Sequence, residues 1–150
     1  GFIPMITPDM IAKSGKEADI QKALFCWCAL PEIQARYPDL KWLHHIPNGG
    51  ERNKIVAANM KAEGVKSGVW DLFLPVRSTW AGAATFPGIY IEMKKPGEKA
   101  KKNGGLSDAQ IAFGTKVREE GYYTAVAYSW REAAANLTWY LTGEVDEGLK

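Results

Sequence analysis

The run Gly88-Ile-Tyr-Ile-Glu-Met-Lys94 decides how this 150-residue chain folds and what kind of site it carries. Its pattern is typical of a β-strand, in which residues two apart point to the same face. Glu92 and Lys94 therefore share one face. The other face carries Ile89, Ile91 and Met93. Charged side chains are rarely buried without a partner, so a charged pair on one face of an apolar strand indicates a site.

A second predicted strand, Val69 to Val76, precedes this run and carries Asp71 near its start. The connection through residues 78–82 is short and shows no helical pattern, so the two strands are expected to pair as antiparallel neighbours. In that arrangement Asp71 and Glu92 can bind the same ion. Asp71, Glu92 and Lys94 are therefore the first candidates for catalytic residues.

This set of side chains suits the hydrolysis of a phosphodiester. The reaction needs charge stabilisation on the phosphoryl oxygens and a water activated near neutral pH, and a divalent metal ion provides both. Mg²⁺ prefers oxygen ligands and retains several waters, which two carboxylates allow. Lys94 could orient the attacking water or offset charge on the phosphate. The alternative is a buried ion-pair cluster with a structural role only.

Pattern and capping signals predict the other elements. Helices are expected from Ser14 to about Pro31, from Arg52 to Glu63, from Ser107 to Gly121 and from Ser129 through Leu141. Three of them open with a capping box, namely Ser14–Glu17, Ser107–Gln110 and Ser129–Glu132. Extended segments are expected at Lys41–Ile46 and Tyr122–Tyr128, and turns at Pro47–Gly50 and Asn103–Gly105. The order predicts an α/β fold with a mixed sheet and flanking helices.

Composition limits the class of protein. With 46% hydrophobic and 24% charged residues the chain fits a soluble globular domain, and its net charge is only +2. One domain is expected over residues 1–150, with a core at about 14–142 and a fraying tail at 143–150. There is no membrane-length apolar run and no signal-peptide pattern at the start, so we expect an intracellular protein without a membrane partner. Cys26 and Cys28 are too close in sequence for a disulfide with each other.

Five motifs, in this order, resemble the VRR-NUC (virus-type replication-repair nuclease) family of the PD-(D/E)xK superfamily. They are His45-Ile-Pro-Asn48-Gly-Gly50, Gly64-Val-Lys-Ser-Gly68-Val-Trp-Asp71-Leu72, Ile91-Glu92-Met-Lys94, Leu106-Ser-Asp-Ala-Gln110 and Gly121-Tyr122. Any one alone is weak, whereas five in the right order are specific. One departure is Trp70, where the superfamily often has proline. Proline is not a ligand there, so the metal site is unaffected.

The resemblance implies a restriction-endonuclease-like core and a Mg²⁺ or Mn²⁺ cofactor. It implies that Asp71, Glu92 and the main-chain carbonyl of Met93 are the metal ligands and that Lys94 is the catalytic lysine. Glu17 and Gln110 correspond to an acidic residue on the first helix and a glutamine on the helix after the catalytic strands. Each has an alternative role, because each also ends a capping box.

Candidates for nucleic-acid contact surround this set. Lys94, Lys95, Lys99, Lys101 and Lys102 fall within nine positions, opposed there by Glu98. The run is either a solvated loop or a phosphate-contacting one. The other candidates are Lys66 and Asn48, although a turn explains Asn48 almost as well. His44 and His45 have no third ligand nearby, which favours a structural role or a phosphate contact over metal binding.

Small members of the resembled family are similar to phage-encoded enzymes that act on branched DNA. The resemblance therefore implies a structure-selective DNA endonuclease, a Holliday-junction resolvase, that works in the cytoplasm of a bacterial host. Symmetric cutting of a four-way junction needs two active sites, which implies a homodimer. The alternatives are a nicking or restriction-like nuclease on duplex DNA, and a non-catalytic DNA-binding module on the same fold.

Overall fold

The computed structural model describes residues 5–48, 53–80 and 85–150. Its helices are α1 (Pro8–Ala12), α2 (Glu17–Cys28), α3 (Pro31–Arg36), α4 (Lys54–Ala62), α5 (Asp108–Glu119) and α6 (Trp130–Thr142). Its strands are β1 (His44–His45), β2 (Leu72–Leu74), β3 (Ile89–Met93) and β4 (Tyr123–Ala127). Four 3₁₀ helices described in the same ranges are η1 (Pro38–Trp42), η2 (Pro96–Ala100), η3 (Lys102–Gly105) and η4 (Glu147–Leu149).

The strands form one mixed sheet in the order β1-β2-β3-β4. β2 pairs antiparallel with β3, and Leu72 lies opposite Ile91, so the expected antiparallel pairing is confirmed. β3 pairs parallel with β4, and α5 lies in the crossover that a parallel pair requires. β2 is shorter than predicted, and Asp71 occupies a bend directly before its first residue. The catalytic candidates therefore lie where β2 begins and β3 ends.

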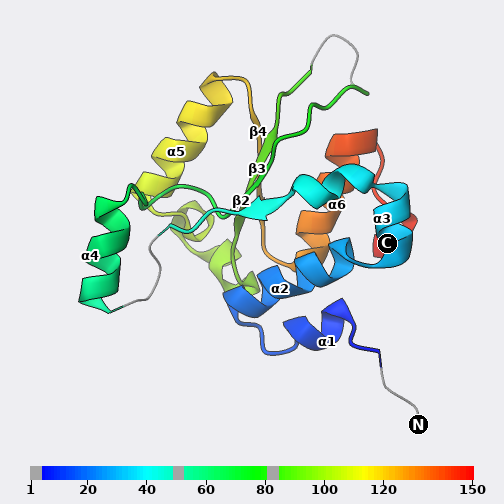
Figure 1. Ribbon diagram of the computed structural model, residues 1–150, viewed down its shortest axis with the longest axis horizontal. Coiled ribbons are helices and arrows are strands. Elements are labelled where there is room, and N and C mark those ends of the chain that lie inside the picture. The colour runs from blue at the N-terminus through cyan, green and yellow to red at the C-terminus, as the bar shows by residue number, and fades with distance from the viewer. Residues whose placement is uncertain (1–4, 49–52, 81–84) are drawn as a thin grey trace.

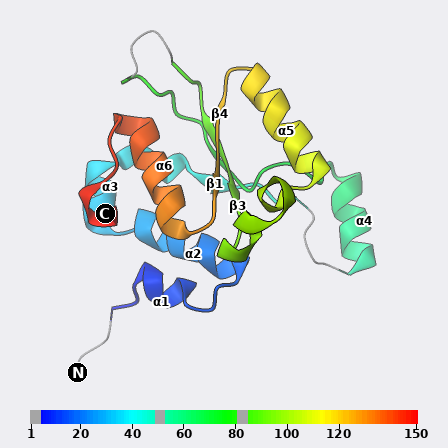
Figure 2. The ribbon, with the colours of Figure 1, turned by 180° about the vertical axis from the view of Figure 1, so that it is seen from behind.

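Helices cover both faces of the sheet (Figures 1 and 2). α2 and α6 pack against each other and against β3, on the face that receives Ile89, Ile91 and Met93. α5 lies on the opposite face, where the Tyr90 ring meets the Phe113 ring edge to face at 5.1 Å. The α/β class and the mixed sheet flanked by helices are thus confirmed. Because β3 is covered on both faces, any charge on it is held away from solvent.

The N-terminal part differs from the prediction. No capping box forms at Ser14–Glu17: α2 begins at Glu17, Lys16 is its N-cap, and no side chain caps it. The Ser14 hydroxyl instead donates to Asp19 Oδ2 at 2.6 Å, and Gly15 has a φ of 73°, which turns the chain between α1 and α2. The missed helix α1 is five residues long and packs on α2.

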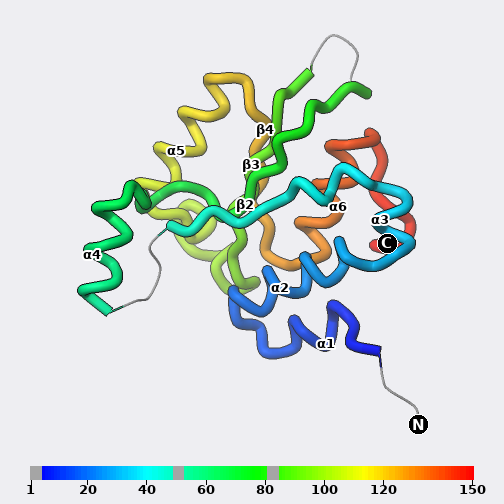
Figure 3. The backbone as a smooth tube through the Cα atoms, viewed as in Figure 1, coloured from blue at the N-terminus to red at the C-terminus, as the bar shows by residue number. Residues whose placement is uncertain are grey.

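The C-terminal tail is held to the body of the domain, where the sequence predicts fraying. Asp146 is buried, and its carboxylate pairs with the Arg36 guanidinium and accepts a hydrogen bond from the Tyr37 hydroxyl. The Thr138 hydroxyl accepts a hydrogen bond from Asp146 N at 3.1 Å. Figure 3 shows the C-terminal end beside α3, which carries Arg36.

The structure also tests the predicted capping box, turns and helix starts. The Ser107 capping box and the break at Asn103–Gly105 are confirmed, the latter by positive φ angles at all three residues. α4 begins at Lys54 with Asn53 as its cap, while Arg52 and the Gly49–Gly50 part of the predicted turn lie outside the described residues. Both cysteines are free. None of the described helices is long and apolar enough to cross a membrane.

Candidate functional site

Two carboxylates meet where β2 begins and β3 ends. Asp71 is 6% exposed and Glu92 is 1% exposed. Each accepts a hydrogen bond from the main chain of the other segment: Asp71 N donates to Glu92 Oε1 at 3.1 Å, and Met93 N donates to Asp71 Oδ2 at 2.8 Å. These reciprocal bonds fix both side chains against the hairpin. They follow from the register in which Leu72 faces Ile91.

The proximity of the two carboxylates has a large electrostatic effect. Burial raises the pKa of Glu92 to about 9, and the neighbouring negative charge of Asp71 adds to the increase. Two like charges in a site of low dielectric repel each other, so the second ionisation is unfavourable until a cation compensates it. The protein alone therefore provides a binding position for positive charge at this point.

Lys94 follows Glu92 on the same face, as the strand period predicts. Its ammonium lies 3.7 Å from Glu92 Oε2, and the Lys94 side chain is 12% exposed. The main-chain N of Lys94 donates to Ala127 O, which extends the pairing of β3 with β4 past Met93 and fixes the backbone that carries the lysine. Lys94 is the nearest cation to the pair, and it offsets only part of their charge.

Gln110 contacts the site directly, and it also caps α5. Its Oε1 accepts from Ser107 N at 2.9 Å, while its Nε2 donates to Glu92 Oε2 at 2.7 Å. One side chain therefore completes the capping box and also contacts the Glu92 carboxylate. Buried Trp70 supports this position, because its Nε1 donates to the main-chain O of Gln110 at 2.8 Å. Trp70 thus fixes the first turn of α5 beside the site.

Glu17, at the first position of α2, lies on the open side of the pair. It is half-buried, and its carboxylate does not cap the helix. Burial raises its pKa, and the charge of Asp71 raises it further, which places Glu17 in the field of the same site. The capping alternative is therefore excluded for Glu17. Its predicted role at the metal site stays a prediction.

Asn48 and His45 reach the site from the segment around β1. The Asn48 Nδ2 donates to Asp71 Oδ1 at 3.3 Å and to Val69 O at 3.2 Å. His45 Nδ1 lies 2.9 Å from Asp71 O, so its Nδ1 must carry the proton, because a carbonyl only accepts. Asn48 therefore positions the Asp71 carboxylate, a contact that the turn motif alone does not predict.

The predicted nucleic-acid lysines are not gathered at one place. Lys95, Lys99, Lys101 and Lys102 are exposed on the segment of η2 and η3 that follows β3. Within it the Lys101 ammonium pairs with Glu98, and Lys99 lies over the Tyr128 ring. Lys66 is exposed on a different loop, after α4. The predicted lysines thus belong to two separate segments, and none of them contacts the Asp71 or Glu92 carboxylate in the described contacts.

The residues present suit a hard divalent cation. Asp71 and Glu92 offer carboxylate oxygens, and the Met93 main chain adjoins Asp71 through its N–H. Among the described residues, no cluster of three or more His, Cys, Asp or Glu side chains is arranged to hold a metal. A site with two carboxylates, one carbonyl and several waters fits Mg²⁺ or Mn²⁺ better than Zn²⁺, which takes three or four protein ligands.

Comparison with known proteins gives a likeness in structure. No family model matches the sequence, and no curated protein matches it. A solved structure described as a "VRR_NUC domain protein" is similar over 93% of this chain and 93% of its own, with a TM-score of 0.62 and 22% sequence identity. At that identity the likeness concerns the fold. The chain therefore has the fold of a VRR_NUC domain protein, as the sequence resemblance implies.

Proposed function

We propose that this protein is a divalent-metal-dependent DNA endonuclease. The observation that carries the proposal is the buried pair Asp71 and Glu92, joined across β2 and β3, with the Lys94 ammonium 3.7 Å from Glu92. Without a bound cation, burial and the charge of Asp71 raise the pKa of Glu92, so the ionised pair needs added positive charge, which supports a metal site over a purely structural cluster. The fold likeness to a VRR_NUC domain protein supports a nuclease.

Each residue has a role in phosphodiester hydrolysis. A Mg²⁺ or Mn²⁺ ion held by Asp71, Glu92 and the Met93 carbonyl would supply Lewis acidity and a more acidic bound water. Lys94 orients the attacking water or balances charge on the phosphate. Gln110 and Asn48 keep Glu92 and Asp71 in place through their amide N–H groups. Glu17 accepts a hydrogen bond from water at the open side of the site.

The proposed substrate is branched DNA, with a four-way junction as the first choice. Exposed lysines on two segments, one after β3 and one after α4, can contact phosphates of two arms. Symmetric cutting needs two copies of the chain, so the proposed active form is a homodimer. A nicking or restriction-like enzyme on ordinary duplex would use the same chemistry, and a non-catalytic DNA-binding module would use only the lysines.

A cleavage panel tests the proposal. End-labelled four-way junction and its separate linear arms are incubated with Mg²⁺, Mn²⁺ or EDTA, using wild type, Asp71→Ala and the matched control Asp39→Ala, which changes an exposed carboxylate on η1. We expect cutting of the junction with either metal, by wild type and Asp39→Ala only. Light scattering of the protein alone and with junction measures the number of copies.

The other outcomes are informative in different ways. Equal rates on the junction and on its arms would replace the junction enzyme by a duplex nuclease. Binding of DNA without cleavage under every condition would leave the non-catalytic module. Cleavage by Asp71→Ala at the wild-type rate would remove the metal-site assignment altogether.

A further inference from the structure

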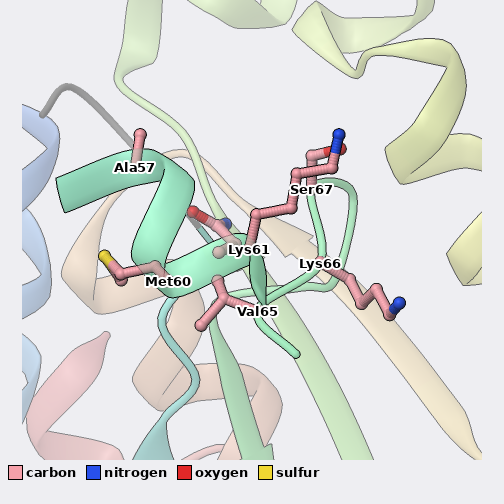
Figure 4. A pocket seen from close by; sticks show the side chains of 7 residues that line it. Ala57, Met60, Lys61, Val65, Lys66 and Ser67 are labelled. Carbon is pink, nitrogen blue, oxygen red and sulfur yellow. The ribbon is translucent and has the colours of Figure 1, made fainter. Parts of the chain in front are cut away.

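We infer that a cavity beside Asp71 holds one unpaired nucleotide of the DNA strand that is cut, which rests on the proposed nuclease function. The cavity has a volume of about 300 Å³ and lies between α4 and the loop at residues 65–67 (Figure 4). Ligand pockets in proteins start at roughly this volume, ~300 Å³. A nucleotide, rather than a whole duplex, is the part of DNA that such a cavity can take.

The cavity adjoins the metal-binding carboxylates through a single side chain. Asn48 lines the cavity, and the same side chain donates to Asp71 Oδ1 at 3.3 Å. A group in the cavity is therefore separated from Asp71 by one amide. This places the nucleotide next to the phosphate that is cut, because successive phosphates of a strand are joined through one nucleotide.

The walls of the cavity match the two parts of a nucleotide. Ala57, Met60 and Val65 provide an apolar wall for the base and sugar. Methionine suits this purpose, because its flexible thioether makes favourable contacts with aromatic rings. The polar part of the wall consists of Lys61, Lys66 and Ser67. Among the described lining residues none is acidic, so the wall is electrostatically complementary to a phosphate.

Figure 4 shows how the polar side chains are placed. Lys61 extends from the last turn of α4 in the direction of Ser67, across the loop, whereas Lys66 points away along the other side of that loop. Lys61 and Lys66 thus extend from the two sides of this loop, and both line the cavity together with Ser67. The sequence singles out Lys66 and gives no sign of Lys61, because the cavity forms only when α4 folds back on residues 65–67.

The position of α4 is not explained by packing in the core. Of the residues described in α4, none is buried, and Ile55 is 77% exposed. Figures 1 and 2 show the helix at one end of the molecule, away from α2 and α6. A helix that contributes so little burial adds little to stability. Since the core does not bury this helix, its Ala57 and Met60 side chains are available to line the cavity.

The occupant must be unpaired, because a base inside a duplex is stacked and cannot enter a side cavity. Extruding a paired base costs a few kcal/mol, and the cost is least where the base is already unpaired. Branch points and strand ends supply such nucleotides. The cavity would therefore give the enzyme its preference for branched DNA over continuous duplex.

A two-way comparison of protein and DNA changes tests this inference. Ala57→Phe fills the cavity, Lys61→Gln removes one of the two lysine charges in its wall, and Lys54→Gln is the matched control on the exposed start of the same helix. Each is assayed on branched DNA that carries either a normal or an abasic nucleotide at the unpaired position next to the cut. We expect the abasic change to lower kcat/KM of wild type by about tenfold, the order of one base contact.

On normal DNA, kcat/KM of the Ala57→Phe protein should be lower than that of wild type by the same factor, because the filled cavity cannot take the base. On abasic DNA its kcat/KM should equal that of wild type, because the contact is already missing there. Lys61→Gln should weaken both substrates alike, and Lys54→Gln neither. As a readout without cleavage, 2-aminopurine at the unpaired position should change its fluorescence in EDTA on binding wild type and not on binding Ala57→Phe. Circular dichroism establishes that each variant is folded.

The inference is wrong if the abasic nucleotide lowers kcat/KM equally for wild type and Ala57→Phe and if Lys61→Gln cuts DNA as well as Lys54→Gln. The proposed nuclease function is unaffected by that result. If Ala57→Phe does not fold, kcat/KM of Lys61→Gln is compared with that of Lys54→Gln. A lower value for Lys61→Gln supports the inference, and equal values contradict it. If wild type cuts no DNA, the proposed function fails, and the fluorescence of bound 2-aminopurine still supports or rejects the cavity as a nucleotide site.

Discussion

Two buried carboxylates in this protein have opposite surroundings. Asp146, near the C-terminus, is 5% exposed. Burial opposes its ionisation, but hydrogen bonds from the Tyr37 hydroxyl and Gly148 N, together with the Arg36 guanidinium, outweigh burial and lower its pKa. Its charge is therefore balanced within the protein. This cluster joins the tail to α3 and requires no ligand.

Glu92 is buried at least as deeply, and its partners do not balance its charge. It accepts hydrogen bonds from Asp71 N and Gln110 Nε2, yet burial and the Asp71 carboxylate raise its pKa. Hydrogen bonding does not separate the two cases, because among the described residues no buried side-chain polar atom lacks a partner. The balance of charge separates them. It distinguishes Asp146, whose charge is balanced inside the protein, from Glu92, which we propose as a ligand of a cation.

The substitution Asp71→Asn should have the largest effect of those that test the contrast between Asp146 and the Asp71–Glu92 pair. The change removes one ligand charge and keeps the side-chain shape, so we expect cleavage of DNA to fall by about 10³-fold or more. The midpoint of thermal unfolding in EDTA should change little, because relief of the repulsion with Glu92 offsets the loss of one of the two hydrogen bonds that the carboxylate accepts, from Met93 N and from Asn48 Nδ2. Single-turnover cleavage and thermal melts measure the two quantities, with Asp39→Asn as control. A large loss of stability would make Asp71 a structural residue like Asp146.

Lys94→Gln tests the cation on the same face. Since it removes charge stabilisation in the transition state, we expect the cleavage rate to fall by about 10²-fold, with little change in DNA binding. Lys54→Gln is the matched control. A change in binding alone, with the rate at saturating DNA preserved, would assign Lys94 to phosphate contact instead of catalysis.

Asp146→Asn should behave in the reverse manner. It removes the charge that pairs with Arg36, so we expect the free energy of unfolding to fall by about 1–3 kcal/mol, while cleavage at a temperature well below the melt is unchanged. Urea denaturation and the cleavage assay measure these effects. Loss of cleavage in a folded Asp146→Asn protein would show that the tail is coupled to the site.

The smallest expected effect is the pH dependence of stability without metal. The pKa of Glu92 is raised in the folded state, so the folded protein holds a proton that the unfolded chain releases above its ordinary value of 4.5. Stability is then greatest below that value and falls as pH rises toward the folded pKa. In EDTA the melting temperature should fall by roughly 3 °C or more from pH 5 to 9.

Glu92→Gln should remove most of this slope, which identifies the group responsible. Mg²⁺ binds the ionised carboxylates, so its stabilising effect on wild type should increase with pH over the same range. A melting temperature that rises with pH in EDTA would contradict the raised pKa.

The catalytic strands could be predicted because their signals are local. The period of two in residues 88–94 sets the faces of β3, and the short connection sets the pairing that brings Asp71 to Glu92. The Ser107–Gln110 box was equally readable, because an N-cap depends on four consecutive residues. These features need no information from distant parts of the chain.

Other features depend on distant contacts or on competition between neighbouring residues. At Ser14 the hydroxyl binds Asp19, so the apparent capping box does not form. α1 has a Thr7 cap and Pro8 at its start, but five residues are too few to show a helical period. The tail pairs with Arg36, which is 110 positions away in sequence, and the contact of Asn48 with Asp71 likewise arises from tertiary structure.

Because the Gln110 side chain makes two hydrogen bonds, few substitutions at position 110 can preserve both of them. At the third position of a capping box, glutamate and glutamine are interchangeable for the helix, so substitution between them is ordinarily close to neutral. Here the amide nitrogen donates to Glu92, and a glutamate would have no proton to give and would add a third negative charge beside Asp71. A change that leaves α5 intact would thus alter the hydrogen bonding and the charge at the proposed metal site. The cap position is therefore under two constraints, and only glutamine meets both.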